Sequence, residues 1–334
     1  MLQPPSLAHS LLALGPQELF ACARALGSPL PAGAPAETAA RAIAARLQGA
    51  PQELRFFLPP EALSAVAGLS GSASLHLRPG KSEPTLVRAL MMADSAAFAV
   101  CEQVHGGIDV SLPPELPGLA AACLGAVSRE EFARLDTLSL LIRGLLYHCG
   151  VLTAREIAVR LPEHTTAEEI LQLIVLYAPL HVLRAMPCGD VPCFIDPHVE
   201  DPEATRAAIL ARPTLPPRVF RREELLSAGS EGYCETPRRA SSCARTLSLL
   251  GLSPEEGADV LQRAIFARKN DAPADALLRL LGVPLLKGEE REIYSAAVME
   301  LLNDVSMYML KGNTSAQVQV MEQMGVWQGD EETV

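Results

Sequence analysis

Apolar and polar residues alternate with a helical period along most of the chain, in short segments that proline and glycine separate. Four apolar residues near the N-terminus follow the i, i+3, i+4, i+7 pattern of one helix face: Leu19, Cys22, Ala23 and Leu26. Pro16 stands where a first helical turn accepts proline, and Gly27 stands where a helix is commonly capped. The pattern predicts a series of short helices over residues 6–69.

Two later stretches predict β-hairpins, near residues 97–114 and 180–197. In the first, apolar runs flank His105-Gly106-Gly107, and in the second the sequence PCGDVPC places Gly189 and Asp190 at the turn. When the second stretch is shifted by 83 positions onto the first, the apolar positions of a helix and its hairpin coincide. The aligned residues are Val87, Leu90 and Met91 with Ile170, Leu173 and Ile174, and Ile108 and Val110 with Val191 and Cys193. The coincidence predicts an internal duplication of a helix followed by a hairpin.

Three helical segments accompany the second hairpin, "LDTLSLLIRGLLYHCG", "LTAREIAVRL" and "HTTAEEILQLIVLYA". Thr153 with Glu156 three residues later is the pattern of a capping box. Three helices with a two-stranded wing describe a winged helix, whereas the first copy lacks a middle helix. The predicted fold class is mainly α, a multi-module helical protein with winged-helix-like units that carry two short β-hairpins.

After the second hairpin a Pro- and Arg-rich connector leads into further helices. One of them starts at Ser253, with Glu256 in the capping-box position. We therefore expect a helical module at 1–70, a tandem winged-helix-like region at 71–205, and a connector with a helical C-terminal region at 206–334.

Composition and charge limit the function classes. The 334 residues are 49% hydrophobic, which excludes a largely disordered chain, and the net charge of -11 disfavours a general nucleic-acid binder. The N-terminus lacks the basic region of a signal peptide, and the longest apolar run, "ILQLIVLYAPLHVL", falls short of the roughly 20 residues that span a bilayer. We expect a cytoplasmic protein, without membrane contact, whose cysteines are reduced.

Two groups of residues resemble known families. The helix, loop, helix pattern of residues 10–50 resembles the SAP-like module at the start of transcription termination factor Rho. Two further segments resemble a family of bacterial proteins, mainly of the Firmicutes type, that combine a Rho-N-like module, a winged-helix-like middle and a C-terminal LKGxT signature. These segments contain Arg212, Pro213, Leu215, Pro216, Phe220, Glu223 to Leu226, Glu231 to Tyr233, Glu235 to Pro237, Leu310 to Gly312 and Thr314. The resemblance implies no catalytic residue, and the SEC-C zinc tail of some relatives has no counterpart in "VWQGDEETV".

The cysteines of the second hairpin allow two interpretations. Cys188 and Cys193 could form half of a zinc site, with His198, His181, Cys234 or Cys243 completing it. In the shifted alignment their counterparts are His105 and Val110, which favours strand residues that pack in the core. We therefore predict no metal and no cofactor.

The charges of the winged helix favour a protein partner over nucleic acid. The helix that would enter the major groove carries Glu168, Glu169 and Gln172 at its polar positions and no arginine or lysine. Seven arginines form the best basic segment, and they could contact an acidic partner or a nucleic-acid backbone, or pair with the glutamates between them. They are Arg212, Arg218, Arg221, Arg222, Arg238, Arg239 and Arg245.

No catalytic motif is present, and the histidines follow no recognisable spacing. His148 lies in an apolar helix and is predicted to be a hydrogen-bonded core residue. The first hypothesis is a non-catalytic interaction or regulatory protein that binds a protein partner. The second is a transcription-associated nucleic-acid binder, and the third is an enzyme whose site is assembled from dispersed residues.

Overall fold

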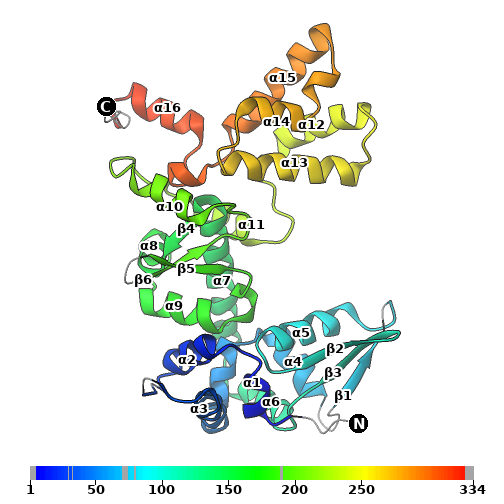
Figure 1. The fold of residues 1–334 in the computed structure, drawn as a ribbon, viewed down its shortest axis with the longest axis vertical. Helices are drawn as coiled ribbons and strands as arrows, with labels where there is room; N and C mark the ends of the chain where they lie inside the picture. The colour runs from blue at the N-terminus through cyan, green and yellow to red at the C-terminus, as the bar shows by residue number, and fades with distance from the viewer. Residues whose placement is uncertain are drawn as a thin grey trace. The chain divides into compact units, whose positions relative to one another are not determined.

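The computed structural model describes residues 5–28, 30, 31, 33–69, 74–78, 80–188 and 191–327. They form a mainly helical protein with two small three-stranded antiparallel sheets, which confirms the predicted fold class (Figure 1). The chain divides into two compact units. Unit 1 comprises Met1–Ser139 and Thr165–Leu183, and unit 2 comprises Leu140–His164 and Arg184–Val334. The domain ranges 1–70, 71–205 and 206–334 stay a prediction.

Unit 1 is built largely from short helices. These are α1 (Leu7–Leu11), α2 (Pro16–Ala25), α3 (Ala36–Gly49), the 3-10 helix η1 (Pro51–Phe56), α4 (Pro60–Gly68), α5 (Pro84–Ser95), α6 (Leu116–Ala126), the first part of α7 (Arg129–Cys149), α9 (Ala167–Leu176) and η2 (Ala178–Leu180). Pro16 opens α2 as predicted, and Gly27, with φ at 69°, ends it. Glycine suits this position because a left-handed backbone crowds any Cβ.

An apolar cluster holds unit 1 together. Phe57 and Phe98 lie at its centre, where their rings meet edge to face with 5.1 Å between centroids. The backbone N–H of Ala178 donates to the carbonyl of Phe57 over 2.9 Å, and the Tyr177 hydroxyl donates to Asp136. These contacts attach the segment after α9 to the core of unit 1.

The two sheets share one strand order. In unit 1, β1 (Ser74–Leu77) and β2 (Val100–Val104) flank β3 (Gly107–Ser111), and in unit 2, β4 (Val151–Thr153) and β5 (Arg184–Cys188) flank β6 (Val191–Ile195). Both predicted hairpins are confirmed. The third strand of each sheet is an addition that the sequence patterns did not predict.

The second copy is longer than the first between its first and second strands, where it contains an additional helix. Strand β2 begins 26 residues after β1, whereas β5 begins 33 residues after β4. Six of the seven additional residues lie between β4 and α9, where the second copy has α8 (Ala154–Arg160), the middle helix that the first copy was predicted to lack. The seventh lies between α9 and β5. The repeat is therefore a helix, a strand, a second helix and a hairpin, with α8 inserted in the second copy.

The structure corrects the register of the repeat in the hairpins. The N-caps of α5 and α9 lie 83 positions apart, as predicted. Across the turns, however, Val104 pairs with Gly107 and Cys188 pairs with Val191, which is an offset of 84. The connection between helix and hairpin is thus one residue longer in the second copy.

This shift changes the counterpart of Cys193, which is Asp109 and not Val110. A one-residue slip exchanges the two faces of a strand, so the alignment gave no valid reason for burying Cys193. It is buried because both faces of β6 are covered over Cys193–Ile195. The turn at residues 189 and 190 lies outside the described residues.

Unit 2 contains the second part of α7 and most of the later helices. These are α8, α10 (Pro202–Leu210), α11 (Arg222–Gly229), α12 (Pro237–Leu249), α13 (Pro254–Lys269), α14 (Ala274–Leu280), η3 (Val283–Leu285), α15 (Gly288–Asn303), η4 (Tyr308–Leu310) and α16 (Ser315–Gln323). The predicted capping boxes are present, with Thr153 capping α8 and Ser253 capping α13. Helices α12 to α15 share an apolar core.

The elements α7, β4, α8, α9, β5 and β6 follow the helix, strand, helix, helix, strand, strand order of a winged helix. Helix α9 belongs to unit 1, where the Gln172 amide donates to the Ala25 carbonyl over 3.1 Å, while β4, α8 and the hairpin belong to unit 2. Across the part of the chain that the structure describes, no helix combines the length and apolar character needed to cross a bilayer.

Two glycines allow α7 and α11 to pack backbone against backbone. A Cβ at Gly144 would lie 2.0 Å from the Leu225 carbonyl oxygen, and one at Gly229 would lie 2.0 Å from that of Leu140. Any larger residue would force the helices apart. This close crossing fixes α11 and the chain that follows it, including Tyr233 and Glu235, beside the end of α7.

Candidate functional site

A fully buried lysine lies at the end of α13. The side chain of Lys269 is 0% exposed, and its Nζ lies 2.8 Å from Oε2 of Glu235. The same ammonium donates to Ser306 Oγ over 2.6 Å and lies 4.2 Å from the ring centre of Tyr147. A charge removed from water requires such partners, because its desolvation is otherwise uncompensated.

His148, near the end of α7, joins this cluster. Its Nδ1 lies 3.0 Å from Ser306 Oγ and 3.4 Å from Glu235 Oε1, and its ring stacks on Phe220 with 4.5 Å between centroids. The backbone N–H of Ser306 donates to Glu235 Oε1 over 2.9 Å. The prediction that His148 is a hydrogen-bonded core residue is confirmed. We name His148, Glu235, Lys269 and Ser306 the buried polar cluster.

Burial and the contacts within the cluster shift the pKa values of its ionisable members. Burial raises the pKa of Glu235, but Lys269 and His148 outweigh that effect and hold the pKa well below its usual value. Burial lowers the pKa of His148 and that of Lys269, and Glu235 opposes both changes. These shifts favour the carboxylate form of Glu235, and burial disfavours the charged forms of His148 and Lys269.

A serine hydroxyl that contacts both a lysine and a histidine is an arrangement that can activate the serine as a nucleophile. Ser306, however, is 0% exposed, and its hydroxyl already contacts both Lys269 and His148. None of the buried polar cluster lines the pocket described next. Its contacts stabilise the junction of α7, α13 and the chain around Glu235 and Ser306.

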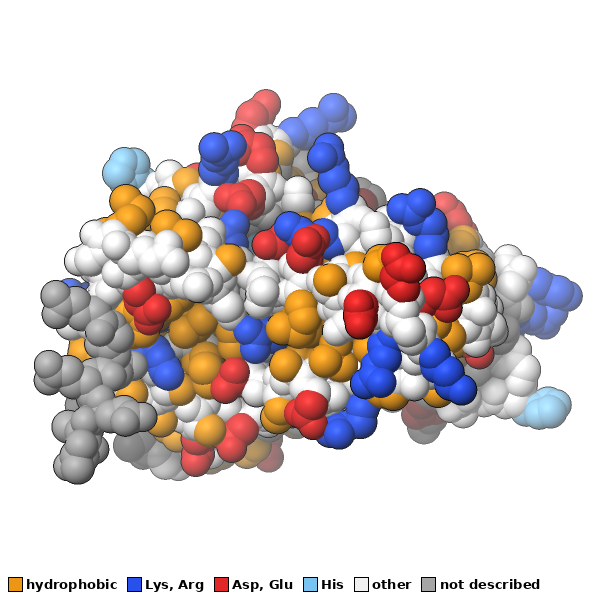
Figure 2. All heavy atoms as spheres, turned by 90° about the horizontal axis from the view of Figure 1, so that it is seen from above, with side chains coloured by type: hydrophobic (Ala, Val, Ile, Leu, Met, Phe, Trp, Pro, Cys, Tyr) orange, Lys and Arg blue, Asp and Glu red, His pale blue; other side chains and the backbone are white. Residues whose placement is uncertain are grey.

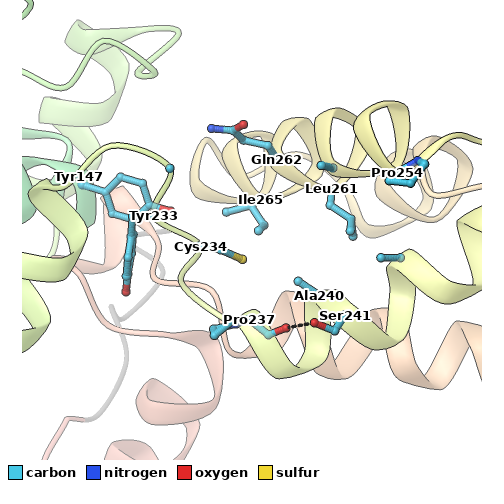
Figure 3. Close-up of a pocket in the computed structure, with 13 residues that line it drawn as sticks. Tyr147, Tyr233, Cys234, Pro237, Ala240, Ser241, Pro254, Leu261, Gln262 and Ile265 are labelled. Atoms are coloured by element: carbon cyan, nitrogen blue, oxygen red, sulfur yellow. Dashed lines mark hydrogen bonds between the residues drawn. The ribbon is translucent and has the colours of Figure 1, made fainter. Parts of the chain in front are cut away.

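An open pocket of about 320 Å³ lies between α12 and α13, and Figure 3 shows its walls. It is lined by Tyr147, Gly232, Tyr233, Cys234, Pro237, Ala240, Ser241, Ala244, Pro254, Ala258, Leu261, Gln262 and Ile265. We name it the α12–α13 pocket.

Small and apolar side chains form most of these walls. From α13, Leu261 and Ile265 point toward α12, whose wall residues follow the i, i+3, i+4, i+7 pattern of one helix face (Figure 3). The Ser241 hydroxyl donates to the Pro237 carbonyl over 2.7 Å. Cys234 directs its thiol toward the space between the two helices.

Tyr147 lines the α12–α13 pocket and also contacts the buried polar cluster. One neighbour of its ring is the Lys269 ammonium, and another is the ring of Tyr233, which it meets edge to face with 5.2 Å between centroids. Burial raises the pKa of Tyr147, and the Glu235 carboxylate raises it further. The buried polar cluster thus supports the wall of the α12–α13 pocket at its Tyr147 end.

The seven candidate arginines do not form one site. Arg218 lies 2.9 Å from Glu224, Arg222 lies 2.9 Å from Glu163, and Arg239 pairs with Glu300 and Asp304. Arg212 donates to the Ala208 carbonyl over 2.9 Å, and the exposed Arg221 is the N-cap of α11. Arg238 and Arg245 are exposed on α12.

The weak metal candidates Cys188, Cys193 and His198 do not converge. The two cysteines form a disulfide, with 5.7 Å between their Cα atoms, which corrects the expectation that every cysteine is a free thiol. The strand pairing of the hairpin brings them together. His198 lies elsewhere, with its ring stacked on Phe266 at 3.6 Å and its Nδ1 2.9 Å from Asp196. Within the described residues, no group of three His, Cys, Asp or Glu side chains could hold a metal ion.

The two segments that carry the bacterial-family resemblance contact each other. The Lys311 ammonium donates to the carbonyl of Arg212 and, over 2.9 Å, to that of Leu215. The Asn313 amide donates to the Pro216 carbonyl over 2.9 Å. These residues therefore join the C-terminal segment to the connector, which is a structural role.

Sequence patterns missed the partners of His148 because they lie far apart in the chain. Glu235, Lys269 and Ser306 have no shared spacing. One signal was available for Lys269, which is among only four lysines in the chain and follows Leu261 and Ile265 at i, i+4 spacing on the apolar face of its helix. No family model matches the sequence, and the searches of curated proteins and of solved structures also found no match.

Proposed function

We propose that this chain is a non-catalytic interaction protein and that the α12–α13 pocket of unit 2 receives an apolar side chain of a protein partner. The pocket itself carries the proposal. Its volume of about 320 Å³ lies at the lower end of the roughly 300–1,000 Å³ of sites that enclose small ligands, which suits a single large side chain. Its walls offer apolar contact from Leu261 and Ile265 and few polar groups.

The properties of the polar groups support a binding role over a catalytic one. Those that could perform acid and base chemistry belong to the buried polar cluster, where they contact each other and do not line the pocket. Among the described residues, His148 Nε2 has no hydrogen-bond partner. In the pocket wall, the Ser241 hydroxyl is bonded within its own helix. A pocket with aromatic, aliphatic and small walls is typical of sites that accept an anchoring side chain.

The alternative function is a transcription-associated nucleic-acid binder, which rests on the resemblance of residues 10–50 to the Rho module. The charges on α9 oppose it. Glu168 and Glu169 occupy the first turn of α9, and Glu169 pairs with Arg134. A gel-shift series over salt concentration separates the alternatives, because phosphate contacts weaken steeply as salt rises. We place the protein in the cytoplasm; its six free cysteines fit this location, whereas the Cys188–Cys193 disulfide does not.

A pocket-filling variant tests the protein-binding proposal. Ala258→Trp adds a large side chain at an exposed wall position, and Ala207→Trp adds the same side chain at an exposed position of α10 outside the pocket wall. In affinity capture from native cells, wild type and Ala207→Trp should retain one common protein that Ala258→Trp loses. Equal retention by all three chains, or no retained protein, would contradict the proposal.

A further inference from the structure

We infer that the partner segment places acidic side chains against α12 and basic side chains against α13. This inference rests on the proposed protein-binding function and adds the charge of the partner to it. It comes from two rows of charged residues that border the α12–α13 pocket on its two helices. Each charged residue of a row lies three or four residues from a pocket-wall residue on the same helix.

The row on α12 is basic. Arg238 and Arg245 lie three residues before and four residues after Ser241, a wall residue, so the three side chains are neighbours on one helix face. Both arginines are exposed. Within the described part of the chain neither has a carboxylate within ion-pair distance, unlike Arg218, Arg222 and Arg239. Two cations beside an apolar pocket favour carboxylates on whatever occupies it.

The row on α13 is acidic over its first half, and the exposed Arg263, which donates to the Asp259 carbonyl over 3.4 Å, follows it. Glu255 lies three residues before Ala258, and Asp259 lies three residues before Gln262, and both of these neighbours line the pocket. Glu255 and Asp259 are exposed, and in the described ranges neither forms an ion pair. The pocket therefore has a basic border and an acidic border on opposite helices.

Charges of both signs are spread over other parts of the surface as well. Figure 2 shows acidic and basic side chains interspersed with apolar ones over the face it draws. The basic row on α12 and the acidic row on α13 determine the direction in which a partner segment lies across the pocket. The apolar anchor supplies affinity, and the rows supply orientation and discrimination.

The thiol of Cys234 offers a direct probe, because it is half-buried and points into the pocket. We would use two eight-residue peptides that share a central leucine and a cysteine disulfide-bonded to 2-mercaptoethanol. Glutamates flank the leucine in one peptide and lysines in the other. Mass spectrometry at equilibrium in 2-mercaptoethanol measures the fraction of each peptide attached to Cys234, with the half-buried Cys101 of unit 1 as the reference thiol.

The charge rows predict opposite changes in attachment. Arg238→Glu with Arg245→Glu should lower attachment of the acidic peptide about fivefold, because exposed ion pairs contribute about 0.2–1 kcal/mol each, and should raise that of the basic peptide. Glu255→Lys with Asp259→Lys should do the reverse. Arg279→Glu with Arg291→Glu, an equal charge change elsewhere in unit 2, should alter neither by more than about twofold.

The outcomes separate this inference from the proposed function. If Ala258→Trp abolishes attachment of both peptides while the arginine reversals change nothing, the pocket binds apolar segments and the charge inference is wrong. If Ala258→Trp has no effect, or if Cys234 reacts no more than Cys101, the pocket is no binding site and both proposals fail. A preference that disappears in 0.5 M salt supports the charge rows.

Discussion

The two sheets have one strand order and different surroundings. In unit 1, Asp109 of the middle strand lies 2.6 Å from His76 at the surface. In unit 2, the chain leaving the middle strand reaches Asp196, which is buried and accepts a hydrogen bond from Tyr308 over 3.2 Å. The Lys269 ammonium lies 5.6 Å from the centre of the Tyr308 ring.

The difference shows that one topology can carry either a solvated polar pair or a buried charged network. In unit 2 the C-terminal segment covers the region beside the sheet, and its Tyr308 and Ser306 bring the strand end and the buried polar cluster together. The unit 1 sheet has its polar pair in water, where ion pairs contribute little. Four changes would test this contrast.

The largest effect is expected from Glu235→Ala. It leaves Lys269 buried without its carboxylate, and the free energy of unfolding should fall by about 3–5 kcal/mol. Asp109→Ala in unit 1 should cost at most about 1 kcal/mol, because that pair is solvated. Urea unfolding with hydrogen exchange of each unit measures both. Glu235→Leu with Lys269→Met should recover most of the loss, and equal small losses in both sheets would refute the contrast.

Glycine substitutions are expected to give the second-largest decrease in the free energy of unfolding. Gly150 has φ at 75°, and a Cβ there would lie 2.7 Å from the Tyr308 ring. Gly106, in the unit 1 turn, has φ at 90° and no neighbour within 4 Å. Gly150→Ala should cost about 2–4 kcal/mol from backbone strain and overpacking, and Gly106→Ala about 1–2 kcal/mol from strain alone. Thermal unfolding compares them, and identical costs would show that Tyr308 does not press on Gly150.

Reduction of the Cys188–Cys193 disulfide should have an intermediate effect. Closing so short a loop stabilises by about 2 kcal/mol in the chain-entropy description. The unit 1 hairpin has Val104 and Asp109 at the equivalent positions and should be unaffected. Dithiothreitol should increase hydrogen exchange in β5 and β6 and leave β2 and β3 unchanged. A uniform increase in both hairpins would mean that the disulfide stabilises no particular sheet.

The pH dependence is the smallest effect. Burial lowers the pKa of His148, although Glu235 opposes it and Lys269 and Arg218 add to it. As pH falls, the imidazole of His148 therefore takes up a proton at a higher pH in the unfolded state than in the folded state. The free energy of unfolding decreases below pH 6.5, the usual pKa of histidine, by at most about 1.4 kcal/mol per pH unit. Glu235, with its lowered pKa, adds a loss of the same sign below pH 4.5.

A histidine variant isolates that contribution. In unit 1, His181 also has its pKa lowered by burial and gives the same sign, so the wild-type profile contains both. His148→Gln should remove part of the slope between pH 6.5 and 4.5, measured as the free energy of unfolding at each pH. An unchanged slope would show that folding does not lower the pKa of His148.

Local patterns predicted the elements whose causes are local. Thr153 with Glu156 and Ser253 with Glu256 cap helices in the structure as their spacing indicated, and both hairpins form where apolar runs flank turn residues. The strands β1 and β4 escaped prediction because three or four residues carry too little periodicity. Their partners lie more than 30 residues away, so no local signal marks them.

The candidate site was much less predictable. Periodicity placed Leu261 and Ile265 on one face of a helix, but it did not show that this face borders a pocket. The seven arginines could be identified from the sequence, but the sequence did not show which of them pair with carboxylates. Their carboxylate partners, such as Glu163 for Arg222 and Glu300 for Arg239, are distant in sequence.

The sequence by itself determined a mainly helical chain, its caps, its two hairpins and the repeat that relates them, because these depend on residues within one or two turns of each other. Tertiary structure alone showed how the second hairpin aligns with the first, that Cys188 and Cys193 form a disulfide, and that His148, Glu235, Lys269 and Ser306 converge. Each depends on which distant segments pack together. Buried charge requires such convergence, since only partners brought from far along the chain can replace the water that folding removes.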